Sequence, residues 1–358
     1  MNRKFQFCLS AIVALATAFA LTACSSSPSL KEGGGGGGGG QIIGAGSTFV
    51  YPLMSRWIAD YQQKQPNVRI NYQSIGSGGG IQQLKQGLVD FGATDMALPD
   101  DHLKEMPALV QIPETAGPVC ITYNLPNLSQ PLKLSAKTLS GIYLGTIKNW
   151  QDPAIKQENP GVALPHQSIF VVHRSDGSGT TNIFTTYLDA VNADWKSKVG
   201  KGLSVSWPTG IGGKGSEGVT GLVKQNPGAI GYVELSYADV NKLPVVQMEN
   251  KAGKFVTPSA AGASAAIDAY SSELQKDVRT PIVDPPASAG DAYPISGLTF
   301  LLVPTTPKDA GKGAQTKAFI NYIITEGQAT TESLHYSKLP PSLQQIDKTL
   351  LDKVQVGG

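Results

Sequence analysis

Three short segments rich in glycine and hydroxyl residues combine the side chains that bind oxyanions. They are Gly44-Ala45-Gly46-Ser47-Thr48-Phe49, Ser74-Ile75-Gly76-Ser77-Gly78-Gly79-Gly80 and Arg174-Ser175-Asp176-Gly177-Ser178-Gly179-Thr180. Hydroxyl groups can donate hydrogen bonds to an anion, and glycine lets backbone N–H groups approach it closely. Arginine adds a planar, charged fork that suits two oxygens of one ligand. The pattern predicts an anion-binding site.

Each segment lies where a strand pattern changes into a helix pattern. Apolar runs precede the segments, and apolar residues at helical spacing follow them. Helix starts expose unpaired N–H groups and a partial positive charge, which favours an anion there. The simpler interpretation is that Ser and Thr only cap these helices, but three such junctions, one carrying Arg174, favour a shared site. The residues expected on the three apolar helix faces are Leu53, Met54, Trp57, Ile58 and Tyr61; Ile81, Leu84 and Leu88; and Phe184, Tyr187, Leu188 and Val191.

Catalytic and cofactor templates do not fit these loops. Gly177-Ser178-Gly179 lacks the glycine spacing of a nucleophile elbow. Gly212-Gly213-Lys214-Gly215 has glycine where a P-loop requires Ser or Thr, and Phe49 stands where a dinucleotide fingerprint needs its third glycine. The three cysteines and four histidines show no metal-ligand spacing. We therefore expect a binding protein without a metal, a cofactor or enzymatic activity.

Composition limits the architecture and the partners. Strand-like and helix-like segments alternate from residue 41 onward, which indicates an α/β protein. The length of 358 residues favours two lobes over one core. Apart from Arg3 and Lys4, basic and acidic residues are equal at 27 each, so we expect no nucleic-acid partner. Cys120 lies in an apolar run and is expected to be a free, buried thiol.

The first 40 residues have the pattern of an exported and lipidated chain. Residues 1–23 carry two basic residues near their start, Arg3 and Lys4, followed by an uncharged apolar stretch, and this pattern predicts an export signal. Leu21-Thr22-Ala23-Cys24 resembles the bacterial lipobox, which predicts a lipid on Cys24. Residues 24–40 then form a Ser/Gly-rich flexible linker. The alternative, a transmembrane helix, also places the body outside the cytoplasm.

The chain resembles the substrate-binding protein of the bacterial phosphate ABC importer, the PstS type, along nearly all of residues 41–358. The matching segments occur in the family's order. They are residues 44–49, 72–77 and 89–95, then Arg174-Ser175-Asp176-Gly177-Ser178-Gly179-Thr180, residues 207–215, and Pro227-Gly228-Ala229-Ile230-Gly231-Tyr232-Val233-Glu234. The departures are small, with His173 in place of a frequent second arginine and Gly78 in place of a frequent serine.

The resemblance implies a two-lobed periplasmic-binding-protein fold of type II, with the ligand cleft between lobes joined by a two-crossing hinge. Residues 41–115 and 294–358 would form lobe I, and residues 116–293 lobe II. The family's phosphate contacts fall on Thr48, Phe49, Ser77, Asp95, Arg174, Ser178, Gly179 and Thr180, with Asp176 pairing the arginine. Implied partners are inorganic phosphate, the transmembrane subunits of the importer and, through the lipid, a bacterial membrane.

Asp95 has a physical role within this resemblance, because a carboxylate beside an anion is repulsive unless the ligand carries a proton. Phosphate keeps a proton at neutral pH and sulfate does not, so Asp95 would select phosphate. Three alternatives remain: a receptor for another tetrahedral oxyanion such as sulfate or molybdate, an exported hydrolase of phosphate esters, and a structural surface lipoprotein.

Overall fold

The computed structural model describes residues 40–126 and 128–356. The expected export signal (1–23), Cys24 and the linker as far as residue 39 lie outside the described residues. No helix among the residues described is long and apolar enough to cross a membrane.

The central element is an eight-stranded mixed sheet, accompanied by a small three-stranded one. The large sheet has the order β2 (Ile70–Ser74), β1 (Ile42–Gly46), β3 (Phe91–Thr94), β11 (Ser296–Pro304), β4 (Leu109–Tyr123), β8 (Ala229–Glu234), β6 (Phe170–Arg174) and β7 (Ile211–Gly213). The small sheet has the order β10 (Phe255–Val256), β9 (Gln247–Glu249) and β5 (Lys133–Leu134).

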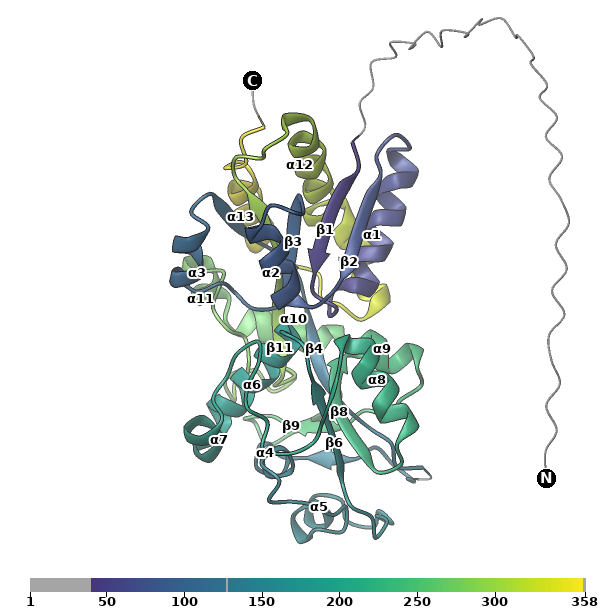
Figure 1. Cartoon of the computed structure of the whole chain (residues 1–358). Coiled ribbons are helices and arrows are strands. Elements are labelled where there is room, and N and C mark those ends of the chain that lie inside the picture. Colours follow the sequence, from purple (N-terminus) through teal and green to yellow (C-terminus); the bar gives the residue numbers. More distant parts are fainter. Residues whose placement is uncertain (1–39, 127, 357–358) are drawn as a thin grey trace, which may run out of the picture. The chain divides into compact units, whose positions relative to one another are not determined.

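The large sheet has two parallel ends joined by antiparallel strands. β1 pairs in parallel with β2 and β3, and β6 pairs in parallel with β7 and β8. Between these ends, β11 runs antiparallel to β3 and β4, and β4 runs antiparallel to β8. Figure 1 shows β4 and β11 passing between the end that holds β1–β3 and the end that holds β6 and β8. We call these ends lobe I and lobe II.

Helices cover both ends of the sheet. Those of lobe I are α1 (Tyr51–Lys64), α2 (Ser77–Lys85), α3 (Asp100–Glu105), α12 (Ala310–Ile324) and α13 (Pro341–Leu351), with the 3-10 helices η1 (Glu326–Thr330) and η2 (Glu332–Leu334). Those that lie between β4 and β11 in the chain are α4 (Ala136–Tyr143), α5 (Pro153–Glu158), α6 (Gly179–Val191), α7 (Ala193–Lys198), α8 (Gly215–Gln225), α9 (Leu235–Val240), α10 (Ala260–Ala269) and α11 (Ser271–Lys276). The expected two-lobed α/β fold is confirmed.

The apolar faces expected from helical spacing are largely buried. Leu53, Met54 and Trp57 of α1 are fully buried, and so are Phe184 and Leu188 of α6. Burying such side chains contributes roughly 1.5–3 kcal/mol each, which fixes both helices against the sheet. Cys120, on β4, is a free and buried thiol as expected.

The helix that follows β2 is shorter than the spacing predicted. α2 ends at Lys85, and Leu88 is 61% exposed instead of continuing the buried face of Ile81 and Leu84. The reason is Gly87, whose φ of 68° is a left-handed conformation that stops a helix. The expectation for Leu88 was therefore wrong.

Candidate ligand-binding site

The three predicted loops meet where the two lobes face each other. The loop before α2 contacts the loop before α6 directly, because the N–H of Gly78 donates to the carbonyl of Gly177 at 2.9 Å. All eight predicted contact residues are buried, although they come from elements as far apart in sequence as β1 and α6. The structure thus brings the complete predicted set together at one place.

Ser77 joins the two lobes through its hydroxyl oxygen. That oxygen accepts the N–H of Asp95 at 3.3 Å and the N–H of Gly179 at 3.1 Å. Position 179 has no room for a side chain, since a Cβ atom there would lie 2.5 Å from Ser77 Oγ and 2.6 Å from Asp95 Cβ. Glycine at 179 therefore permits the close approach of the backbone that an anion site requires.

Thr48 makes a second link between the lobes. Its Oγ1 lies 2.8 Å from the hydroxyl of Ser216 and accepts the N–H of Ser216 at 3.2 Å, at the start of α8. The hydroxyl of Tyr237 donates to the carbonyl of Thr48 at 2.6 Å. The neighbouring Phe49 is fully buried and packs edge-on against Tyr336, whose hydroxyl donates to the carbonyl of Phe49 at 2.6 Å.

Arg174 provides the positive charge of the site. Its guanidinium donates to both carboxylate oxygens of Asp176, from Nε at 2.8 Å and from Nη2 at 2.5 Å, and Nη1 lies 3.5 Å from the hydroxyl of Thr180. Burial tends to raise the pKa of Asp176, but the hydrogen bonds and charge of Arg174 outweigh it and hold the pKa below its ordinary value. Asp176 therefore stays ionised and fixes the orientation of the guanidinium.

The simpler interpretation, that hydroxyl residues only cap the helices, holds for one junction out of three. Ser178 caps α6, since its Oγ accepts the N–H of Thr181 at 3.1 Å. No side chain caps α1 or α2. Two of the first N–H groups of these helices bond to backbone instead, since Tyr51 donates to the carbonyl of Thr48 at 3.4 Å and Gly78 to that of Gly177 at 2.9 Å.

Asp95 is the acidic member of the site and is 3% exposed. One of its carboxylate oxygens accepts the hydroxyl of Ser47. Burial raises the pKa of Asp95 to about 6, while hydrogen bonds from Ser47 and Thr299, the charge of Arg174 and a hydrogen bond from Thr180 oppose this rise. At neutral pH the carboxyl is mostly ionised and can accept a proton-bearing oxygen.

Sequence reasoning missed Ser47, Ser216 and Tyr237, which contact the predicted residues. Ser47 lies inside a predicted segment, but its contact with Asp95 depends on the pairing of strands distant in sequence. Ser216 had a usable signal. Gly212-Gly213-Lys214-Gly215-Ser216 is a strand end leading into a helix start, as in the other three segments. The segment does not match a nucleotide-binding loop, but the start of its helix could still contribute to an anion-binding site.

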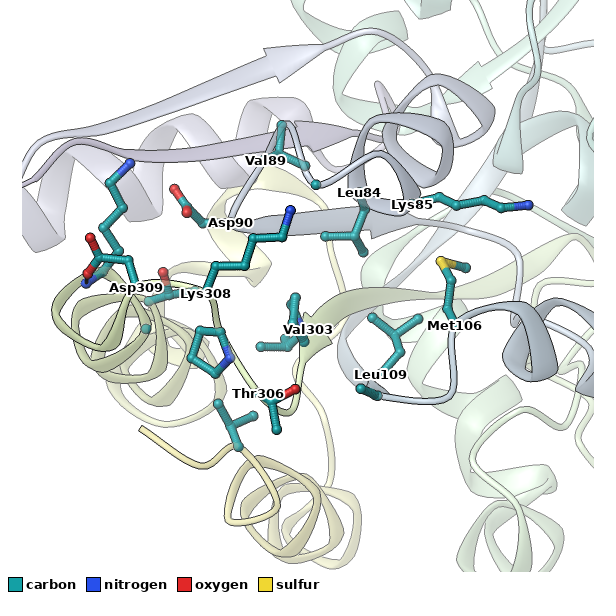
Figure 2. A pocket seen from close by; sticks show the side chains of 18 of the residues that line it. Leu84, Lys85, Val89, Asp90, Met106, Leu109, Val303, Thr306, Lys308 and Asp309 are labelled. Carbon is teal, nitrogen blue, oxygen red and sulfur yellow. Dashed lines mark hydrogen bonds between the residues drawn. The ribbon is translucent and has the colours of Figure 1, made fainter. Parts of the chain in front are cut away.

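Cavities do not by themselves locate this site. Figure 2 shows one of about 430 Å³ in lobe I, between α2, β11 and α12, lined by apolar residues such as Leu84 and Val303 with Lys308 and Asp309 at its edge. It contains none of the predicted contacts. Another, of about 310 Å³, borders Asp95. In the part of the chain that the structure describes, no cluster of three His, Cys, Asp or Glu side chains could hold a metal.

Comparisons with known proteins show which family the chain belongs to. Residues 32–326 match the model of the PBP superfamily domain. The chain is 45% identical to the phosphate-binding protein PstS of Xylella fastidiosa over 309 residues, covering 86% of this chain and 84% of that protein. It is 42% identical to the phosphate-binding protein PstS of Pasteurella multocida, covering 85% and 88%.

Solved structures share the fold. A periplasmic phosphate-binding protein (PfluDING) bound with phosphate has a TM-score of 0.70 at 24% identity, covering 86% of this chain and 93% of that one. A phosphate ABC transporter substrate-binding protein from Clostridium perfringens, also with bound phosphate, has a TM-score of 0.61 at 22% identity, covering 84% and 100%.

Proposed function

This chain belongs to the PstS family of phosphate-binding proteins, within the PBP superfamily, and from that premise we propose that its cleft captures inorganic phosphate and delivers it to an ABC importer. The observation that carries the proposal is the meeting of three Gly/Ser/Thr loops around one buried arginine and one buried carboxyl. A binding role also fits a site that holds donors and acceptors in place without a paired nucleophile and base.

The donors would divide between the two lobes. Lobe I would supply the hydroxyl and N–H of Thr48, the N–H of Phe49 and the hydroxyl of Ser77. Lobe II would supply the guanidinium of Arg174, the hydroxyls of Ser178 and Thr180, and the N–H groups of Gly179 and Thr180. Both lobes must contribute for the ligand to be surrounded, so phosphate would favour the arrangement in which the lobes touch.

Asp95 would give the site its selectivity. Its ionised carboxyl can accept the hydrogen of a protonated phosphate, whereas fully deprotonated sulfate offers only negative oxygens to it. The buried position of Asp95 strengthens this discrimination, because little water screens the repulsion.

The proposed division of the chain into two lobes is based on β4 and β11, the two strands that connect them. We propose that residues 41–115 with 294–358, and residues 116–293, rotate as two lobes about β4 and β11. The protein would work outside the cytoplasm, exported by residues 1–23 and held to a bacterial membrane by lipid on Cys24 through the linker that ends at residue 40.

The decisive experiment is calorimetry of the purified full-length protein with phosphate, sulfate and a chromogenic phosphate ester. Phosphate should bind tightly, sulfate weakly, and the ester should not release its chromophore. Tight sulfate binding would favour a receptor for another oxyanion, and release of the chromophore would favour a hydrolase.

A further inference from the structure

A second buried carboxyl lies behind Asp95. Glu114, on β4, is fully buried, and its Oε1 accepts a hydrogen bond of 3.0 Å from the hydroxyl of Thr299 on β11. The same hydroxyl lies 3.3 Å from the carbonyl oxygen of Thr94, one residue before Asp95, and it is close enough to the Asp95 carboxyl to lower the pKa of that group. One hydroxyl group therefore stands between the carboxyl that faces the ligand and a carboxyl that the proposed site does not use.

An irregularity in the strand ladder places Glu114 there. Thr299 pairs with Thr115 but Phe300 pairs with Pro113, so Glu114 is the extra residue of a β-bulge. A bulge redirects the side chain it contains, and this one directs a carboxyl into the interior. The second oxygen of Glu114, Oε2, has no hydrogen-bond partner among the described residues.

The surroundings favour the neutral form of Glu114. The polar groups that face it are Asp95 on β3, the phenol of Tyr72 on β2 and Thr299, while Gln328 of η1 donates to its backbone carbonyl at 2.8 Å. None of them is a cation. Burial raises the pKa of Glu114 to about 8, with the Thr299 hydroxyl opposing the rise and the charge of Asp95 adding to it. Arg174 acts on Asp95 but not on Glu114.

The single hydrogen of the Thr299 hydroxyl couples the two acids. A hydroxyl donates one hydrogen bond and accepts others. Protonated Glu114 can donate to Thr299, which leaves the hydrogen of Thr299 for Asp95. Ionised Glu114 instead competes for that hydrogen, and it places a second negative charge behind the ligand acid.

We propose that protonated Glu114 is a positioning residue that, through Thr299, keeps Asp95 an ionised acceptor for the hydrogen of bound phosphate. The inference rests on the proposed function of the cleft. Its consequence is a proton linkage, since phosphate binds best while Glu114 holds its proton. Affinity falls as the pH rises through the pKa of Glu114, and bound phosphate in turn raises that pKa.

The test is phosphate affinity from about pH 6 to about pH 10, by calorimetry on full-length parent protein and three variants. Above about pH 8 phosphate remains a dianion with one proton, so a further loss of affinity reports on the protein. We expect the parent to weaken on the order of tenfold between about pH 8 and pH 9.5, from one added charge in a poorly hydrated site. Glu114→Gln, whose amide donates permanently, should bind well at neutral pH and lose this dependence.

Two further variants separate the proposed relay from burial in general. Glu234→Gln removes another fully buried carboxyl, whose pKa is also about 8 but whose hydrogen-bond partners are Ser236 and Tyr336. This variant should lose phosphate affinity at alkaline pH as the parent does. Thr299→Val should weaken binding at neutral pH, since it removes the hydroxyl that lies between Glu114 and Asp95. An alkaline loss in Glu114→Gln equal to that of the parent, or no loss in the parent, would overturn the inference.

The outcomes remain distinct from those that test the cleft itself. Failure of the parent to bind phosphate at neutral pH would remove the proposed function, whereas normal binding with a flat alkaline profile would remove only the role of Glu114. If Glu114→Gln does not fold, carboxyl-carbon NMR titration of the parent decides. The pKa of Glu114 should rise when phosphate is added, and an unchanged value would contradict the relay.

Discussion

Replacement of Arg174 by alanine should reduce phosphate affinity more than any other single change in the cleft. A guanidinium has five N–H donors. Two are engaged by Asp176 and a third is directed toward Thr180, which leaves about two for a ligand. Two charge-assisted hydrogen bonds at about 1.5–3 kcal/mol each predict a loss of about 3–6 kcal/mol, or about 10²- to 10⁴-fold in affinity.

The same substitution has a side effect that the experiment must separate. It strands the carboxylate of Asp176, whose side chain is only 14% exposed, and breaking a buried ion pair from one side costs about 3–5 kcal/mol of stability. The double variant Arg174→Ala/Asp176→Asn removes the stranded charge. We expect thermal unfolding to show recovered stability in the double variant, while calorimetry shows phosphate affinity still lost.

The refuting result is specific. If the double variant binds phosphate nearly as well as the parent, Arg174 serves the local structure and does not contact the ligand. Arg174→Lys offers an intermediate case, because it keeps the charge but loses the planar fork, so its affinity should fall between those of the parent and the alanine variant.

Three other predictions concern selectivity, pH and anchoring. Asp95→Asn should lower phosphate affinity only modestly but should reduce the preference for phosphate over sulfate. In the parent protein we expect this preference to be tenfold or more, and each factor of ten corresponds to about 1.4 kcal/mol. Competitive titration with both anions measures the ratio of affinities, and an unchanged ratio would show that Asp95 does not determine selectivity. Burial raises the folded-state pKa of both Glu114 and Glu234 to about 8, so the folded protein binds these protons more tightly than the unfolded chain. The ligand-free protein should therefore lose stability from about pH 4.5 to about pH 8, by up to about 1.4 kcal/mol per pH unit for each group; thermal melts should show a smaller slope in Glu234→Gln, and an equal slope would contradict the assignment. Cys24→Ala should abolish lipid attachment, and mass spectrometry that finds no diacylglycerol adduct on the parent protein would contradict the anchor.

The local parts of the site were predictable from sequence because they are local in the chain. A strand end, its Gly/Ser/Thr loop and the following helix occupy about ten consecutive residues, so periodicity and helix-start chemistry indicated the segments around Thr48, Ser77 and Ser178. The family resemblance then supplied the roles of Asp95 and Arg174. The first inference uses residues that are close together in sequence, and the second uses a motif pattern that is already known for the family.

The remaining parts depend on strand pairing between distant segments. Thr48 meets Ser216 across 168 positions, and Thr299 reaches Glu114 across 185. No periodicity in either segment specifies that register, and the bulge that redirects Glu114 is one residue of irregularity inside a largely apolar strand. From sequence alone, a glutamate at such a position is expected to be exposed, because acidic side chains are rarely buried. Only the three-dimensional neighbours show that it is buried.

The order of the strands also affects the order in which the emerging chain can fold. β3 pairs with β11 about 200 residues later, and β1 lies beside β3, so the lobe I part of the sheet lacks a member until residue 304 has emerged. β4, β6 and β8 need only residues as far as 234 to pair with one another. As the chain emerges from its N-terminus, lobe II strands can therefore assemble while β3 still presents an uncovered sheet edge. β3 is thus among the first strands to appear and among the last to be completed, and its edge is the one that a chaperone would need to protect.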